Sequence, residues 1–239
     1  MQDISSSRSP ALAVLTFGVA LAFAVTPFIA DPFRGFEPDQ FPVPIGALPI
    51  QPAGWAFSIW GAIYLWLIIG TGYGALKQAT DPGWAPHRPW LIASLAIGTA
   101  WLFVANESAE AATILIVAML LTALKALALA PPEKRSLVRW PIGLYAGWLT
   151  AASFVAIATL AAGYGLAAPQ LASWIALPPA VILAAWLTLR LWTPTYPAAA
   201  AWAAIGISVA NYPSGFAWGA ATGATLLIAL TSLAIVRRL

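Results

Sequence analysis

Three tryptophans set deep in apolar segments are the residues of this chain whose type and spacing could do chemistry. Counted at about 1.5 Å of rise per residue, Trp60 lies roughly 12 Å below one membrane face, and Trp148 and Trp101 lie roughly 12 and 18 Å from the other. In a hydrocarbon core about 30 Å thick, all three indoles would share the central layer. An indole is flat and apolar, with one N–H donor that costs free energy there unless it finds an acceptor.

Aromatic and small residues accompany each tryptophan at helical spacing. Positions three, four or seven residues apart lie on one face of a helix. The three stripes are Phe57, Trp60 and Tyr64; Ser94, Gly98 and Trp101; and Tyr145, Trp148 and Ala152. Each stripe could line a shared ligand cavity, or could be helix packing whose polar atoms bond to backbone carbonyls. Spacing alone leaves both interpretations open.

The composition shows which elements must position these side chains. Of 239 residues, 61% are hydrophobic and 8% are charged, with a mean hydropathy of +0.84, which excludes a water-soluble globule. The absence of cysteine and the single histidine exclude disulfides, thiolate chemistry and a multi-histidine metal centre. No catalytic motif is present, so we expect a binding protein without a required cofactor rather than an enzyme.

The chain is predicted to be an all-α integral membrane protein, because eight stretches approach the roughly 20 apolar residues that a spanning helix needs. Proline or polar residues separate them. The predicted spans are Ala11–Ala30, Pro52–Ala75, Pro89–Val104, Ala111–Ala130, Trp140–Tyr164, Leu171–Leu191, Tyr196–Ala210 and Gly215–Val236. The first could alternatively be a cleaved signal peptide, but its apolar run is longer than such peptides carry.

The distribution of charge predicts the orientation of the spans. With eight spans, ten of the eleven lysines and arginines fall on one side, the exception being Arg34, and five of the eight acids fall on the other. Because cytoplasmic loops carry the excess of cations, both termini are expected in the cytoplasm, in a bacterial inner membrane. The net charge of +3 is spread along membrane segments, so no nucleic-acid partner is expected.

Other features concern packing and the interfaces. Six tryptophans near span boundaries are expected in interfacial belts, and glycine pairs four residues apart predict close helix packing within the chain or in a homodimer. Pro178-Pro179 could break the sixth span at a transport site or only kink it. The six belt tryptophans are Trp84, Trp90, Trp140, Trp174, Trp192 and Trp218.

The segment from Pro52 to Tyr64, PAGWAFSIWGAIY, resembles the start of the second helix in the TspO/MBR family of tryptophan-rich sensory or translocator proteins. The family signature there is Pro-Pro-Gly-Trp, then Phe, then Trp-x-x-Leu-Tyr. The resemblance continues through Trp90–Glu107, similar to the third helix, and Leu144–Ala152, similar to the fifth. It covers about residues 10–165.

The resemblance implies a five-helix bundle over residues 1–165 with a pocket for a tetrapyrrole such as protoporphyrin or haem, covered by the first loop. Residues 166–239 would be a three-helix extension. A sensory, regulatory or transport role follows from the family; the alternatives are an accessory subunit of a membrane complex and a small-molecule transporter. The ligand-binding residues are expected to be Phe57, Trp60, Tyr64, Gly98, Trp101, Tyr145, Trp148 and Ala152.

Three departures from the family pattern concern the pocket itself. Phe57 stands one residue closer to Trp60 than in the usual motif, which would turn it by about 100° around an α-helix. Ser94 and Gly98 replace the amide side chains of the family's third helix. The first loop, Asp31–Gln51, carries phenylalanines instead of tryptophans.

Overall fold

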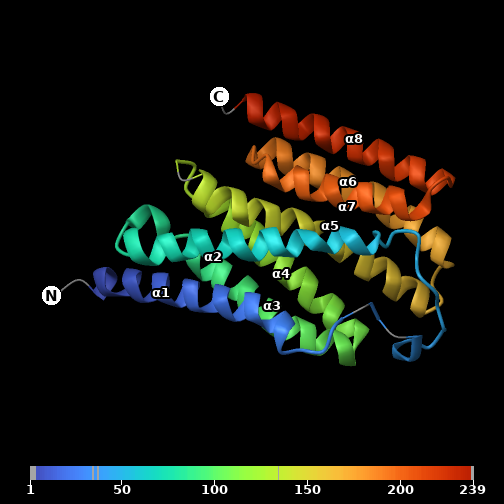
Figure 1. The fold of residues 1–239 in the computed structure, drawn as a ribbon, viewed down its shortest axis with the longest axis horizontal. Coiled ribbons are helices and arrows are strands. Elements are labelled where there is room, and N and C mark those ends of the chain that lie inside the picture. The colour runs from blue at the N-terminus through green and yellow to red at the C-terminus, as the bar shows by residue number, and fades with distance from the viewer. Residues whose placement is uncertain (1–3, 34, 37, 134, 238–239) are drawn as a thin grey trace.

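The computed structural model describes residues 4–33, 35–36, 38–133 and 135–237. The described chain folds into α-helices joined by short connections and one long loop between the first two helices (Figure 1). The helices are α1 (Ile4–Val25), α2 (Ile59–Lys77), α3 (Arg88–Glu107), α4 (Ala109–Leu129), α5 (Trp140–Gly163), α6 (Pro169–Leu191), α7 (Thr195–Asn211) and α8 (Gly215–Val236).

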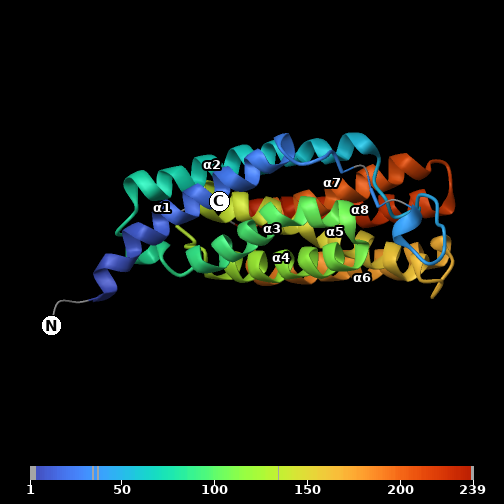
Figure 2. The ribbon, with the colours of Figure 1, turned by 90° about the horizontal axis from the view of Figure 1, so that it is seen from below.

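The helices run along the long axis of the molecule, and α5 lies at its centre. It packs against α2, α4, α6 and α7. Figures 1 and 2 show α1 to α4 on one side of it and α6 to α8 on the other, with the first and last helices starting and ending at the same end of the bundle. Because helices pack on both sides of α5, side chains from either side can share a site with it.

The all-α membrane fold predicted from the sequence is confirmed. Seven of the eight described α-helices are long and apolar enough to cross a membrane. Helix α7 has 17 residues and falls short of that length. Its Tyr196 and most of its alanines are buried against neighbouring helices. Helix α6 continues through Pro178 and Pro179, so no break in the helix is available there for a transport site.

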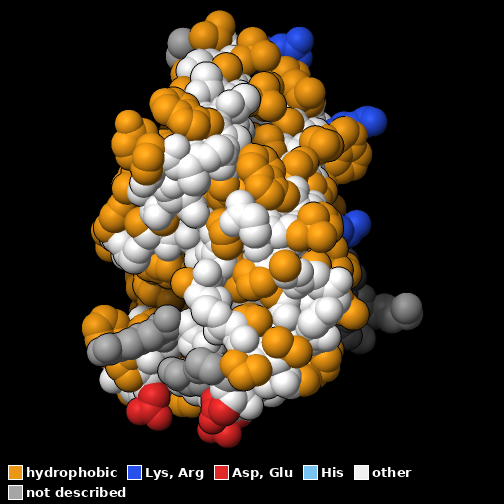
Figure 3. Space-filling model, turned by 90° about the vertical axis from the view of Figure 1, so that its right-hand side faces the viewer, with side chains coloured by type: hydrophobic (Ala, Val, Ile, Leu, Met, Phe, Trp, Pro, Cys, Tyr) orange, Lys and Arg blue, Asp and Glu red, His pale blue; other side chains and the backbone are white. Residues whose placement is uncertain are grey.

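The two ends of the bundle differ in charge. At one end of the bundle α2 ends, α5 begins, and α6 and α8 end. We call it the basic end, because it carries Lys77, Arg139, Arg190 and Arg237. At the opposite, acidic end lie Asp31, Asp39, Glu107 and Glu110. Figure 3 looks onto one end of the molecule, where acidic side chains gather at the lower edge of an otherwise largely hydrophobic surface.

Glycines let the helices approach closely within this one chain. A Cβ on Gly147 would lie 2.2 Å from the Tyr196 carbonyl oxygen of α7, and one on Gly70 would lie 2.0 Å from the Leu137 carbonyl oxygen. Gly219 and Gly223 of α8 face Trp174 and Val181 of α6. These small-residue faces are thus occupied by intrachain packing.

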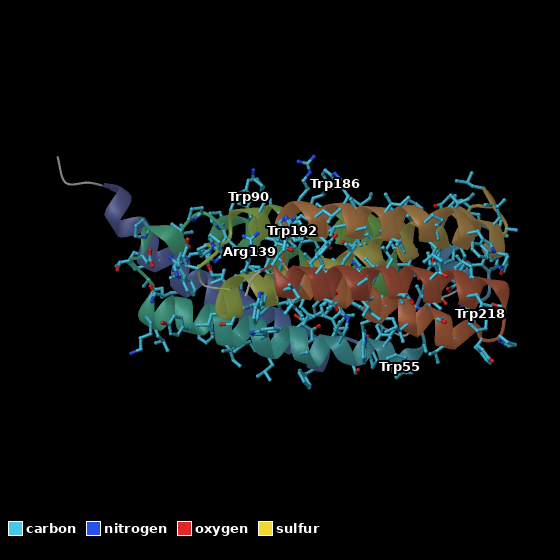
Figure 4. The ribbon with its side chains drawn as sticks, turned by 90° about the horizontal axis from the view of Figure 1, so that it is seen from above. Trp55, Trp90, Arg139, Trp186, Trp192 and Trp218 are labelled. Atoms are coloured by element: carbon cyan, nitrogen blue, oxygen red, sulfur yellow. The ribbon has the colours of Figure 1, made fainter. Side chains whose placement is uncertain are left out.

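Most of the predicted interfacial tryptophans lie at the surface near the ends of the helices. Trp90 points away from the molecule, and Trp218 lies toward the opposite end (Figure 4). Trp84 is the exception, because only 2% of it is exposed. Its ring fills the space beside Gly74, where a Cβ would come within 2.8 Å of it, so this residue belongs to the core rather than to a belt.

Arg88 and His87 are buried beside Trp84 at the basic end. The Arg88 guanidinium donates to the carbonyl oxygens of Gln78 at 2.7 Å, Ala79 at 3.1 Å and Gly74 at 3.4 Å. A cation at these carbonyls stabilises the C-terminal end of α2. Burial and the neighbouring Arg88 charge lower the pKa of His87 from 6.5 to about 4, so the imidazole is neutral at physiological pH.

We expect the protein to lose stability as the pH falls from about 6.5 to about 4. His87 binds a proton more weakly in the folded chain than in the unfolded one, so its contribution is complete above pH 6.5 and decreases as the solution becomes acidic. A pKa lowered to about 4 corresponds to about 3 kcal/mol of unfolding free energy. Thermal unfolding in detergent between pH 8 and pH 4 measures this loss of stability, and the His87→Gln variant is the control. Equal slopes for the two proteins would contradict this assignment.

Candidate functional site

A cavity of about 550 Å³ lies in the half of the bundle nearer the acidic end. Helix α1 ends at Val25, and the loop that follows it contributes part of the lining, together with α3, α4, α5, α7 and the turn before α2. The lining residues are Phe33, Gly35, Phe36, Gln51, Pro52, Gly54, Phe57, Trp101, Ile116, Trp148, Ala151, Ala152, Val155, Ala156, Thr159, Ala203 and Ile207.

One face of α5 forms the longest wall of the cavity. Its lining residues run from Trp148 to Thr159 at intervals of three and four, a length of about 16 Å at the rise of an α-helix. Between these two residues the wall is made of three alanines and Val155. Small side chains along a central helix leave the open volume that larger ones would fill.

Aromatic rings border the cavity on two sides. The Phe57 ring meets the Trp148 ring edge-on at a centroid distance of 5.5 Å, and Phe33 meets Trp101 at 5.2 Å. Phe57 lies in a short 3₁₀ helix, η3 (Gly54–Ser58), rather than in α2. The direction expected for Phe57 assumed an α-helix, and it does not apply in a 3₁₀ helix, which has about three residues per turn. The Phe57 ring lines the cavity in spite of the altered motif.

The cavity has few polar groups, and their hydrogen-bonding states differ. Trp101 Nε1 donates to the Ala112 carbonyl oxygen at 2.9 Å, which meets the need for an acceptor expected from its depth. Thr159 Oγ1 donates to the Val155 carbonyl oxygen at 2.8 Å. Within the described chain, neither the Trp148 indole N–H nor the side-chain amide of Gln51 has a hydrogen-bond partner. Both remain available to a ligand.

Four of the eight sequence-predicted site residues line this cavity: Phe57, Trp101, Trp148 and Ala152. They come from η3, α3 and α5, so the structure brings together three segments that the spacing had proposed. Trp60 contacts Trp148 at a centroid distance of 6.3 Å but does not line the cavity. The three central tryptophans therefore do not form a single contact group, because Trp101 lies across the cavity.

The remaining predicted residues form an aromatic cluster next to the cavity. Phe23 of α1 meets the rings of Trp60, Tyr64 and Tyr145 at 5.9, 5.2 and 5.7 Å, and the Trp60 and Tyr64 rings are stacked. A Cβ on Gly98 would lie 2.5 Å from the Phe23 ring, so this glycine admits Phe23 to the cluster. Trp60, Tyr64, Gly98 and Tyr145 therefore pack the helices against one another around Phe23 and do not line the cavity.

Tyr145 is fixed in this cluster by a hydrogen bond across three helices. Its hydroxyl lies 3.0 Å from Ser94 Oγ, which donates to the Met119 carbonyl oxygen of α4 at 2.8 Å. Ser94, which stands where the family carries an amide, thus joins α3, α4 and α5 and is not available to a ligand. Tyr145 is fully buried, so its role in the described structure is to hold the helices that surround the cavity.

Sequence reasoning missed the contributions of the loop amide and of α7. Gln51 supplies the free amide that the family pattern places on the third helix, but it comes from the loop end before η3. Ala203 and Ile207 of α7 also belong to the lining. No spacing signal links these positions to the tryptophans, because their proximity depends on how α7 packs against α5.

The long loop is bonded to the bundle where it covers the cavity. Gln40 Nε2 donates to the Ala105 carbonyl oxygen at 3.2 Å, and Asn106 Nδ2 donates to the Asp31 carbonyl oxygen at 3.2 Å. The Phe41 ring lies against Gly163, where a Cβ would come within 2.2 Å of it. Phe33, Gly35 and Phe36 of this loop also line the cavity.

Glu110, at the acidic end, is hydrogen-bonded to uncharged side chains outside the cavity lining. Glu110 accepts hydrogen bonds from the hydroxyls of Ser108 and Tyr164, and the bond to Glu110 raises the pKa of Tyr164. No charged side chain belongs to the described cavity lining, and the described residues contain no cluster of His, Cys, Asp and Glu that could hold a metal ion. The arrangement is suited to binding an apolar molecule.

Comparison with known proteins addresses the family of the chain. A family model described as TSPO-like protein matches residues 12–236. The matched range includes α6, α7 and α8 as well as the segment with the tryptophan motifs. The curated proteins and the solved structures that were compared contain no match to the chain. Since the family model covers nearly the whole sequence, the chain belongs to the TSPO-like protein family.

Proposed function

We propose that this membrane protein binds a flat, hydrophobic, tetrapyrrole-type ligand in the cavity along α5. The observation that carries the proposal is a cavity of about 550 Å³ with a mainly apolar lining and two unpaired polar groups, Trp148 Nε1 and the Gln51 side-chain amide. Ligand sites commonly combine apolar walls with a few polar groups that set orientation. The aromatic edges of Phe57 and Trp101 favour a ligand with its own flat π surface.

The lining favours a metal-free porphyrin over haem. Haem proteins hold iron through His, Cys, Met or Tyr side chains. None of these residue types occurs in the described lining of the cavity. Protoporphyrin can use the apolar walls fully, whereas haem iron would lack an axial ligand from these residues.

The proposed role is sensory or regulatory, with transport as the alternative that the family resemblance leaves open. We place the basic end and both termini in the cytoplasm of a bacterial cell, because cations concentrate on the cytoplasmic side of membrane proteins. The ligand cavity then lies in the half of the bilayer that faces away from the cytoplasm, under the long loop.

Titration of the detergent-purified protein with protoporphyrin IX tests the proposal. We expect saturable binding, read as a change in the visible absorbance of the porphyrin and as tryptophan quenching. Trp148→Phe should raise Kd about tenfold, because it removes the unpaired donor and part of the aromatic wall. Trp186→Phe, on the exposed surface of α6, is the matched control and should leave Kd unchanged.

The same titration separates the ligand classes. Haem should bind more weakly than protoporphyrin, and its spectrum should lack the bands of iron ligated by a protein side chain. Non-saturable porphyrin uptake, equal for the parent protein and both variants, would refute the site. A haem spectrum with a protein axial ligand would refute the preference for a metal-free porphyrin.

A further inference from the structure

One wall of the cavity is a short segment whose position is not explained by its own helix. Pro52, Gly54 and Phe57 line the cavity from the turn that precedes α2. Gly54 and Phe57 belong to the 3₁₀ helix η3, and Pro52 precedes it. Such helices have poorer hydrogen-bond geometry than α-helices and occur in short pieces. A segment of this kind needs partners elsewhere in the fold to hold a defined wall.

We propose that α7 positions this wall, with Trp202 and Gly206 holding residues 52–57 in place. Only the ligand in this proposal rests on the proposed function, because the contact between α7 and residues 52–57 can be measured without a ligand. It assigns a role to a helix from the part of the chain that the sequence had suggested was an extension to the ligand-binding bundle.

Two hydrogen bonds join α7 to the backbone of the segment. Trp202 Nε1 donates to the Ala56 carbonyl oxygen at 2.8 Å. The Ala53 N–H, which precedes η3 and has no partner within it, donates to the Gly206 carbonyl oxygen at 3.1 Å. The Ala56 carbonyl oxygen also accepts from the Ile59 N–H of its own segment. Backbone donors that lie away from water need a partner, and the Ala53 N–H has its partner on α7.

The side chains at the same contact fit closely. A Cβ on Gly206 would lie 2.8 Å from the Ala56 Cβ and 3.0 Å from the Pro52 Cβ, so glycine is required for this approach. Ala56 is fully buried beneath it. The ring of Trp55 meets the Trp202 ring edge-on at 4.9 Å. Hydrogen bonds and packing thus act at one place.

The cavity borders the residues next to these contacts on α7. Ala203 and Ile207, each one position after Trp202 and Gly206, line the cavity. Helix α7 therefore contacts residues 52–57 through Trp202 and Gly206, and it lines the cavity itself through Ala203 and Ile207. The separation between α7 and residues 52–57 consequently sets one dimension of the ligand space.

Hydrogen exchange of the peptide covering residues 52–58 tests the holding role without ligand. Trp202→Phe keeps an aromatic ring but removes the donor to Ala56, and we expect exchange at Ala53 and Ala56 to become about tenfold faster. Gly206→Ala should have the same effect by pushing the segment away. Trp218→Phe, whose ring contacts Tyr212 and lies outside the cavity lining, is the control. Unchanged exchange in both α7 variants would overturn the proposal.

Protoporphyrin binding by the same proteins tests the consequence for the site. We expect Kd to rise about tenfold in Trp202→Phe and to stay constant in Trp218→Phe, read by porphyrin absorbance. Faster exchange with an unchanged Kd would show that the segment is held but does not set affinity, which overturns the positioning role. If the parent protein binds no porphyrin, the proposed function fails, while the exchange measurement still decides whether α7 holds the wall.

Discussion

Replacing Ala152 with phenylalanine is expected to raise the protoporphyrin Kd at least about a hundredfold while the protein stays folded. Ala152 lies on the central stretch of the α5 wall and contributes one methyl group to the cavity lining. A benzyl group at this position would enter the space that the ligand needs. Because the cavity provides room for the new ring, the helices around it need not separate.

The control for this variant places the same ring on the opposite side of the same helix. Ile157 is 45% exposed and lies outside the cavity lining, so Ile157→Phe should leave Kd unchanged. Porphyrin absorbance gives Kd, and circular dichroism with a thermal scan verifies that both variants are folded. Wild-type affinity in a folded Ala152→Phe protein would show that the ligand binds elsewhere.

Gly147→Ala is expected to destabilise the bundle by about 3 kcal/mol, which lowers the thermal midpoint by about 5 to 10 °C. The added Cβ would lie 2.2 Å from the Tyr196 carbonyl oxygen and 3.0 Å from the Ala199 Cβ. The closest atom belongs to the backbone of α7, so no side-chain rotation can relieve the overlap. The Tyr196 hydroxyl also lies 2.9 Å from Thr150 Oγ1, a contact that a shift of α7 would strain.

Gly61→Ala is the matched control for this prediction. Gly61 also lies inside a helix, α2, but its added Cβ would meet no atom within 4 Å. This substitution should be neutral or stabilise the protein by about 0.5 to 1 kcal/mol, as alanine is the better helix former. Similar midpoints for the two alanine variants in detergent would contradict the close packing of α5 on α7.

Trp60 was predicted from helical spacing to bind the ligand, but it does not line the cavity. Spacing placed Phe57, Trp60 and Tyr64 on one α-helical face, but Phe57 lies in η3 and the other two lie in α2. The change of helix type separates the ring that lines the cavity from the two that pack against Phe23. The pattern of residue types does not show that the chain forms a 3₁₀ helix before α2 begins at Ile59.

Burial of Trp84 has a similar origin. Its place near a span boundary predicted an interfacial position, yet the glycine at position 74 opens a space that only its indole fills. Which of several boundary tryptophans turns inward depends on the partner helix. A one-dimensional count of depth has no access to that partner.

The sequence by itself determined the membrane class, the eight helices, the charge difference between the two ends and four of the residues that line the cavity. These follow from local composition and periodicity, since the bilayer sets the length and polarity of each span. The tertiary structure alone decided that Gln51 and α7 complete the cavity around α5. Contacts between segments more than 100 residues apart, such as Trp202 with Ala56, arise from the packing of whole helices. Spacing along one helix describes only the face that it offers, and the structure decides which distant surface meets that face.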